Sequence, residues 1–112
     1  MANTFKLKTF DGSTTAGNTD MTIYTVPAST TAVVIGLNLS NLITTDTVTA
    51  DIKINNADGD NVFLVKNAPI PTGGALEVMS GNKINMETGD AVVVQSNTAN
   101  SVDSTLSIME IT

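Results

Sequence analysis

The sequence predicts an all-β protein, namely a single antiparallel two-sheet β-sandwich of the jelly-roll type with eight or nine strands. Apolar and polar residues alternate with a period of two through most of the chain, which is typical of strands with one buried face. Gly, Pro, Asn, Asp and Thr clusters interrupt this alternation about every ten residues, a spacing typical of sandwiches and small barrels. No stretch shows the 3.6-residue period of an amphipathic helix.

The first half of the chain contains three of the expected strands. Residues 4–10 alternate between apolar and polar positions, and a polar, Gly-containing loop follows at residues 11–20. A second strand covers residues 21–26 and ends at Pro27, which has no backbone N–H to donate. Residues 31–40 form the strongest strand. Because its start is apolar on both faces, we expect this strand in a central position of its sheet.

The second half begins with a hairpin over residues 47–66, whose two strands are joined by the polar turn at residues 56–60. Two prolines and a glycine pair then predict a connection that crosses from one sheet to the other. The remaining strands are expected at residues 76–78, 84–86, 92–96 and 102–111, with turns at Gly81–Asn82, 88–90 and 97–100. One face of the last strand carries Val102, Ser104, Leu106, Ile108 and Glu110.

The length of 112 residues predicts one domain, spanning residues 1–112. Thr, Asn and Ser make up 38 of these residues, yet the apolar residues are periodic rather than sparse, which argues against disorder. Residues 1–20 comprise the first expected strand and a loop. This segment is favoured as part of the chain's own sandwich, and an arm that adds a strand to a neighbouring molecule is the alternative.

Composition excludes several classes of partner. The net charge is −6 and the chain has no Arg, so neither a nucleic acid nor an anionic membrane surface is an expected partner. No apolar run is long enough for a membrane span, and the first six residues lack the apolar core of a signal peptide. The absence of Cys excludes disulfides and thiolate metal sites.

Catalysis is not expected, because the chain has neither His nor Cys to act as a base or nucleophile. Its three glutamates, Glu77, Glu87 and Glu110, are interpreted as solvated surface carboxylates rather than as an acid–base pair. No Ser-x-x-Lys pattern offers a lysine to activate a serine. The sequence therefore predicts a protein that is not an enzyme and uses no cofactor.

One segment partly matches a calcium-binding loop. Asn56, Asp58 and Asp60 occupy the first, third and fifth positions of that pattern. However, Asn61 stands where the loop requires Gly, and Asn67 stands where it requires Glu. We therefore expect a polar hairpin turn and no metal site, and weak cation binding between protomers is the remaining alternative.

Two further residue types bear on binding. The five lysines are spread along the chain, and outward lysines on strands typically guard sheet edges against unwanted pairing. Pairing with an acidic partner is the alternative role for them. Tyr24 is the only Tyr and there is no Trp, so a sugar-stacking platform is nearly absent, and we expect Tyr24 to be buried or to lie at an interface.

The run from Ile23 to Leu37, IYTVPASTTAVVIGL, resembles an opening common among small structural proteins of tailed bacteriophages, in which a TVPA-x-TTA-x-VIGL segment leads into a β-sandwich. Three later pieces fit the same pattern. These are FLVKNAPIPTGG at residues 63–74, ETGD at residues 87–90 and LSIMEI at residues 106–111. The resemblance covers roughly residues 20–112 and consists of strand and turn signatures, so it transfers no functional residues.

This resemblance implies a non-enzymatic virion component, as in phages of cyanobacteria and other marine hosts. The leading expectation is a capsid decoration or cement protein that lies on the capsid surface and stabilises the mature head. Its partners would be the major capsid protein or other virion proteins, and it would form a homo-oligomer, a trimer or a ring. Phe5, Leu7 and Phe10 are the expected anchor residues. The alternatives are a neck, tail or fibre component and a carbohydrate-binding module for host attachment.

Overall fold

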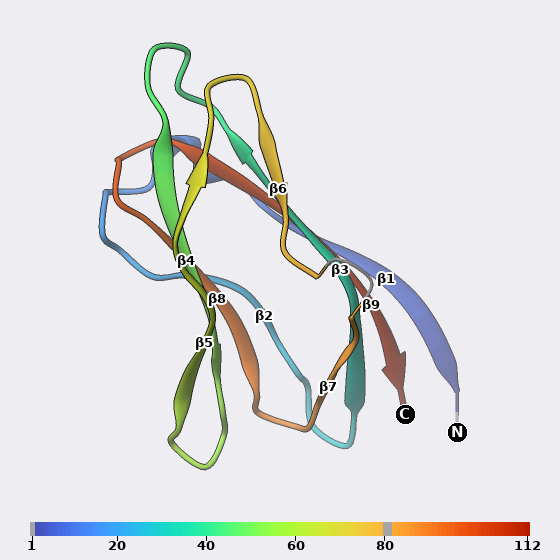
Figure 1. Cartoon of the computed structure of the whole chain (residues 1–112). Helices are drawn as coiled ribbons and strands as arrows, with labels where there is room; N and C mark the ends of the chain where they lie inside the picture. The colour runs from blue at the N-terminus through green and yellow to red at the C-terminus, as the bar shows by residue number, and fades with distance from the viewer. Residues whose placement is uncertain (1, 80–81) are drawn as a thin grey trace.

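Nine strands in two antiparallel sheets build the protein in the computed structural model, which describes residues 2–79 and 82–112 (Figure 1). The strands are β1 (Asn3–Phe10), β2 (Met21–Thr25), β3 (Thr31–Asn41), β4 (Val48–Asn55), β5 (Asn61–Ile70), β6 (Ala75–Glu77), β7 (Ile84–Met86), β8 (Ala91–Ser96) and β9 (Val102–Ile111). A single 3₁₀ turn, η1 (Gly12–Thr14), follows β1. The expected all-β sandwich and its strand number are confirmed. Gly81 of the expected Gly81–Asn82 turn lies outside the described residues.

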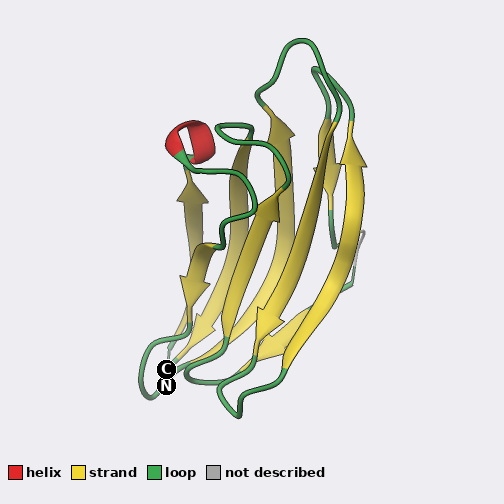
Figure 2. Ribbon diagram, turned by 90° about the vertical axis from the view of Figure 1, so that its left-hand side faces the viewer, coloured by secondary structure: helices red, strands yellow, loops and turns green. Residues whose placement is uncertain are grey.

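The strand order is that of a jelly roll. Sheet A has the order β1-β9-β3-β6, with β7 also paired to β3, and sheet B has the order β2-β8-β4-β5. Because β6 and β7 pair with opposite ends of the same strand, they act as one interrupted edge strand. Counted this way, the first strand pairs with the last, the second with the last but one, and so on to the β4–β5 hairpin. The strands of both sheets run along the long axis of the molecule (Figure 2).

Strand alternation places the core between the two sheets. In β9, the inward residues Leu106 and Ile108 are fully buried, whereas Thr105 and Ser107, which alternate with them, are exposed. β3 lies inside sheet A, between β9 and the β6–β7 edge, so its expected central position is confirmed. The core consists of Val, Ile, Leu, Ala and Met with one Tyr. Aliphatic residues interdigitate between facing sheets, as sandwiches require.

β8 is buried on both faces, which is unusual for a sandwich strand. Val92 and Val94 point into the core, and Val93 points to the outer side of sheet B, where it is nevertheless buried. In the sheet register, Val93 lies between Lys53 of β4 and Thr22 of β2. The Lys53 ammonium reaches Asp20 Oδ2 at 3.2 Å, just before β2, so its aliphatic stem crosses over β8. The Lys53–Asp20 pair thereby shields Val93 from solvent on the outer side of sheet B.

Three local features differ from the sequence-based expectation. The return strand of the hairpin does not stop at residue 66 but continues as β5 to Ile70. Pro69 lies within it, which is tolerated because β5 is an edge strand. The crossing connection to sheet A is correspondingly short, since β6 begins at Ala75. The helical turn lies at Gly12–Thr14, inside a segment expected to be only a loop.

We expect Gly12→Ala to destabilise the fold strongly. A Cβ atom at Gly12 would lie 1.7 Å from the carbonyl oxygen of Val102, where β9 begins. This backbone cannot move without disturbing the pairing of β9 with β3. The expected loss is about 2–4 kcal/mol of unfolding free energy, measured by urea denaturation. Gly36→Ala is the matched control, because the nearest atom to its Cβ would be 3.9 Å away. Equal stability of the two variants would contradict this close approach.

Candidate docking surface

The three expected anchor residues divide between the two faces of β1. Phe5 and Leu7 point to the outer side of sheet A, where their side chains are 73% and 64% exposed. Phe10 points the other way and packs, half-buried, against the hydrophobic core. β1 itself pairs with β9 along its whole length, so residues 3–10 belong to the chain's own sheet. The structure thus brings Phe5 and Leu7 together on one surface but leaves Phe10 out of it.

Phe5 and Leu7 belong to a larger apolar surface, which the alternation in the sequence did not predict because it is formed by three strands. In the register of sheet A, Phe5 lies beside Met109, and Met109 lies beside Val33, which forms an apolar row across β1, β9 and β3. Ile35, at the β3 bulge, is also exposed. We call this surface the apolar strip and define it by its six outward side chains, Phe5, Leu7, Val33, Ile35, Met109 and Ile111.

The apolar strip is uncharged. The other outward residues between its rows are polar and neutral, such as Ser107 and Thr105 of β9. Within the described residues of this face, carboxylates border the strip. Glu87 lines a hollow together with Val33 and Ile111, and Glu77 Oε1 accepts a hydrogen bond from the Leu37 N–H of β3. A hollow of about 300 Å³ borders the strip, and its lining is Thr31, Ala32, Val33, Asn85, Met86, Glu87 and Ile111. A neutral apolar surface beside a hollow suits a contact with protein rather than with an ionic partner.

A buried carboxylate holds β1 in place beneath this surface. Glu110 of β9 is only 5% exposed, and its Oε1 lies 2.8 Å from the ammonium of Lys6 on β1. The hydroxyl of Tyr24, on β2 of the opposite sheet, donates to Glu110 Oε2 at 2.5 Å. The Lys8 ammonium lies 5.9 Å from the centre of the Tyr24 ring. We call Lys6, Glu110 and Tyr24 the carboxylate network. It joins β1, β9 and β2 and therefore links the two sheets.

The network also shifts the pKa values of its members. Hydrogen bonds from Lys6 and Tyr24 lower the pKa of Glu110, although burial acts in the opposite direction. Burial, together with the Glu110 carboxylate, raises the pKa of Tyr24 well above its ordinary value. Glu110 is therefore ionised and Tyr24 protonated at neutral pH, which is the pairing that the hydrogen bond requires.

The interpretation of Glu110 as a solvated surface carboxylate is wrong. The alternation of the last strand contained the contrary signal, because it placed Glu110 on the same face as Leu106 and Ile108. The expectation that Tyr24 is buried is confirmed. Lys6 and Lys53 both pair with carboxylates of the chain itself, so these two lysines stabilise the fold in addition to any protection of an edge.

The segment that partly matched a calcium loop is a polar hairpin turn, as expected. The Asn56 side chain accepts a hydrogen bond from the Asp58 N–H at 3.1 Å, and the Asp58 side chain accepts one from the Asp60 N–H at 3.1 Å. The side chains of Asn56 and Asp58 thus bond the backbone of their own turn. In the described part of the chain, no three Asp or Glu residues gather closely enough to hold a metal ion.

The described residues also contain no helix that is both long and apolar enough to cross a membrane.

Comparisons with known proteins identify the fold only. No protein-family model and no curated protein sequence matches the chain. Among solved structures, the chain is similar to a chain in the acidic stable capsid structure of Helicobacter pylori bacteriophage KHP30, with a TM-score of 0.53 and 15% identity over 98% of this chain and 87% of that chain. It is also similar to a chain of the disulfide-linked pili formed by Bacillus endospore appendages, with a TM-score of 0.48 and 17% identity over 97% and 84% of the two chains.

We expect Glu110→Gln to lower the free energy of unfolding by about 1–2 kcal/mol at neutral pH, because a charged acceptor of two hydrogen bonds becomes neutral. The pKa of Glu110 lies below its ordinary value of 4.5 in the folded state. Its stabilising contribution is therefore present above that pH and is lost as the pH falls through the lowered pKa.

The difference in stability between the natural chain and Glu110→Gln should consequently stay constant well above pH 4.5 and shrink as the pH falls below it, as followed by urea unfolding at each pH. Glu87→Gln is the matched control, since Glu87 is exposed, and it should change stability by less than about 0.5 kcal/mol. A difference that stays constant with pH would show that the Glu110 carboxylate does not carry the effect.

Proposed function

We propose that this chain is a non-enzymatic structural protein of a tailed-phage virion, and that it decorates the outside of the capsid and stabilises the mature head. The observation that carries the proposal is the uncharged apolar strip on the outer face of sheet A, with Phe5 and Leu7 as its most exposed members. Exposed apolar surfaces with polar surroundings mark protein contacts on soluble domains. The partner we propose is the major capsid protein or another virion protein.

The fold supports a structural role. Jelly rolls recur in viral capsid proteins and in lectins. The similarity to a chain in a phage capsid structure extends over nearly the whole of this chain, although at 15% identity it concerns the fold. The lectin function has less support, because the only Tyr is buried in the carboxylate network and cannot stack on a sugar. The strand and turn signatures shared with small phage structural proteins point in the same direction as the fold.

The size of the apolar strip favours assembly in many copies. Three neighbouring strands and five residues of length give roughly 14 by 16 Å, or about 230 Å². A stable pairwise interface needs about 800 Å² on each partner, so one copy alone would bind weakly. Copies that are linked in a trimer or ring and repeated on a symmetric shell gain affinity through effective concentration. This arithmetic supports a homo-oligomer on the particle.

The proposed mechanism is stabilisation by mass action. A protein that binds the assembled, expanded shell and not its precursor shifts the equilibrium toward the assembled state. In our proposal the apolar strip binds the shell, and Phe5 and Leu7 make the central contacts with the partner protein. Phe10 contributes indirectly, because it packs against the core and so helps to keep β1 in its sheet.

Placement on the capsid predicts the copy number. Quantitative mass spectrometry of purified particles should give a ratio to the major capsid protein near one to one, or a simple fraction of it, because decoration follows the symmetry of the lattice. A far lower ratio would place the chain at the tail vertex, in a neck, tail or fibre component, and would contradict the decoration role.

The apolar strip itself is tested by Phe5→Ser combined with Leu7→Ser. Both side chains are exposed and the backbone pairing of β1 is untouched, so the variant should fold normally. Its affinity for particles stripped of this protein should fall by at least about tenfold, because anchors at the centre of an interface dominate its energy. Leu42→Ser removes an apolar side chain that is 36% exposed and lies outside the strip, and this variant should bind normally. Unchanged binding by the double variant would refute docking through this surface.

A further inference from the structure

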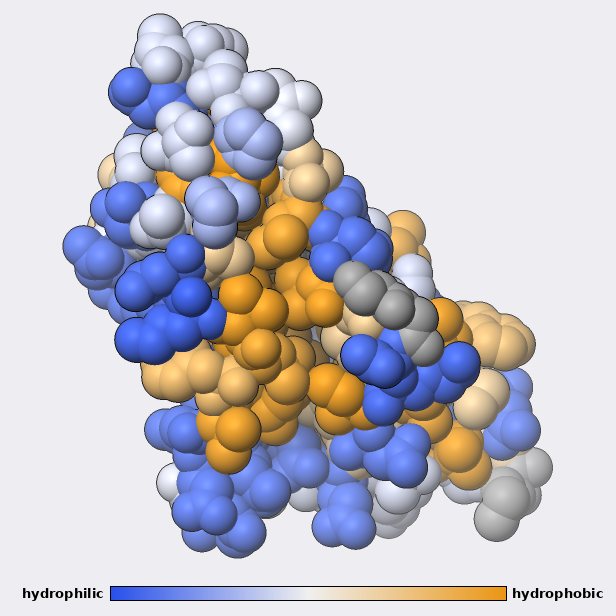
Figure 3. Space-filling view, in the orientation of Figure 1, coloured by the Kyte–Doolittle hydropathy of each residue, from blue (hydrophilic) through white to orange (hydrophobic). Residues whose placement is uncertain are grey.

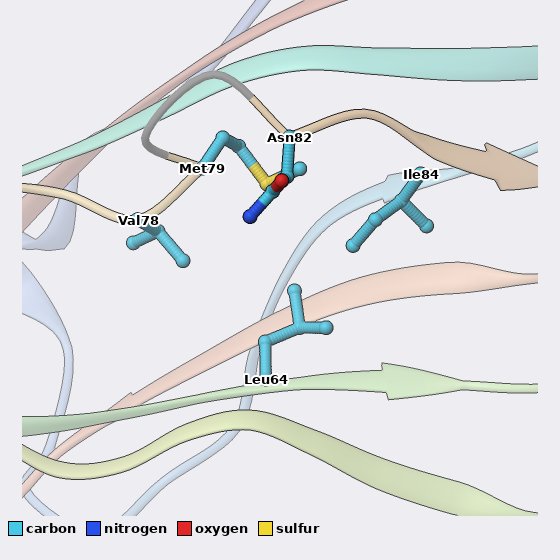
Figure 4. Close-up of a pocket in the computed structure, with 5 residues that line it drawn as sticks. All are labelled: Leu64, Val78, Met79, Asn82 and Ile84. Carbon is cyan, nitrogen blue, oxygen red and sulfur yellow. The ribbon is translucent and has the colours of Figure 1, made fainter.

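A second apolar site lies at the opposite lateral edge of the sandwich, between β5 of sheet B and the β6–β7 edge of sheet A. It is an open groove of about 140 Å³, which we call the edge groove, and its lining is Leu64, Val78, Met79, Asn82 and Ile84. Leu64 rises from β5 and the other four side chains approach from the facing segment, so that all five surround one space (Figure 4). Figure 3 shows hydrophobic side chains gathered along this side of the molecule.

Free backbone groups accompany the edge groove. β5 is the last strand of sheet B and, within the described residues, pairs with β4 alone. Its outer edge therefore offers N–H and C=O groups to an additional strand, as in the strand addition by which many domains bind extended peptides. Val62 and Phe63 are exposed on the same strand, at 58% and 44%. A strand added here would extend sheet B and cover the edge groove.

Charge identifies the kind of strand that fits. Among the five lysines, Lys6 and Lys53 form ion pairs and Lys8 lies near the Tyr24 ring. The remaining two, Lys66 and Lys83, have no carboxylate within ion-pair distance among the described residues. Each is close in sequence to a lining residue of the edge groove, Leu64 and Ile84 respectively. Lys66 is on β5 with its ammonium 4.2 Å from the centre of the Phe63 ring, and Lys83 is exposed between two lining residues.

The two lysines give the edge groove a basic rim in a chain of net charge −6. Lys66 reaches the outer side of sheet B, because Phe63 pairs with Lys53, whose ammonium binds Asp20 on that side. Successive side chains of a strand point to opposite faces. A strand added at β5 would therefore turn every second side chain into the groove and the others to the outer side of sheet B, where Lys66 lies.

We propose that the edge groove binds an extended segment of another protein in which apolar and acidic residues alternate. The apolar side chains enter the space between Leu64 and Ile84, and the carboxylates face Lys66 on the outer side of sheet B. Lys83 adds positive charge from the sheet A side of the groove. A second copy of this chain is a poorer occupant, because pairing through its own β5 edge would bring a further lysine against Lys66. The proposal does not depend on the capsid placement, since it concerns the isolated chain.

The test is a titration of the whole chain, labelled for methyl and amide NMR, with the capped peptide Ser-Asp-Val-Glu-Ile-Asp-Leu-Glu-Ser. We expect saturable shifts at the methyl groups of Leu64, Val78 and Ile84 and at the amides of β5. A peptide with Lys in place of every Asp and Glu should bind at least about tenfold more weakly, because it faces the basic rim. Equal binding of the two peptides, or saturable shifts at the apolar strip instead, would overturn the proposal, as would the absence of saturable shifts.

The rim is tested with Lys66→Glu combined with Lys83→Glu, two exposed changes that leave the fold intact. The affinity for the acidic peptide should fall by about tenfold and that for the lysine peptide should rise. Lys8→Gln is the control for a lysine outside the groove and should bind the acidic peptide normally. Sedimentation of the free chain provides a further criterion. If the chain self-associates and the double variant does not, the occupant is a second copy and the proposal fails.

Discussion

The structure depends on β9, which pairs with β1 along one edge and with β3 along the other. Its inward face supplies Leu106 and Ile108 to the core, and its outward face supplies Met109 to the apolar strip. A shift of one residue would exchange these faces and expose the core residues to water. Glu110 opposes such a shift, because its buried carboxylate meets Lys6 and Tyr24 only in the observed register. An unpaired buried carboxylate is costly, so this polar contact selects one arrangement among strands that otherwise carry similar apolar patterns.

The two faces of β1 show how one alternating strand serves both stability and contact. Lys6 and Phe10 point inward and hold the strand against the carboxylate network and the core. Phe5 and Leu7 point outward and have no packing partner that covers them. Inward-pointing lysines also discourage edge-to-edge pairing with foreign strands. The combination favours contact through the outer face of β1 over contact through its edge, and it keeps the exposed phenylalanine on a rigid sheet rather than on a flexible arm.

The parts of this structure that follow from local sequence were predictable, and the parts that depend on long-range contact were not. Period-two alternation located nearly every strand, and turn residues located the hairpin at residues 56–60, because both signals act within a few residues. Strand order was not accessible, because in a nested fold the first strand meets the last and no local pattern encodes that pairing. The same reason hid the role of Glu110, whose partner Tyr24 is 86 residues away. It also hid the edge groove, since Leu64 and Ile84 belong to the edges of different sheets.

Different interactions close the two lateral openings of the sandwich. This difference distinguishes the role of the apolar strip from that of the edge groove. On the side of β1 and β2, a lysine, a carboxylate and a tyrosine bridge the sheets through charge-assisted hydrogen bonds. On the side of β5 and β7, apolar side chains meet across a space that they do not fill. A fully satisfied polar bridge gains nothing from an added strand, whereas an incompletely filled apolar opening does, because each buried methylene contributes about 0.8 kcal/mol. Added segments should therefore favour the β5 side, which leaves the outer face of sheet A available for contact with a larger surface.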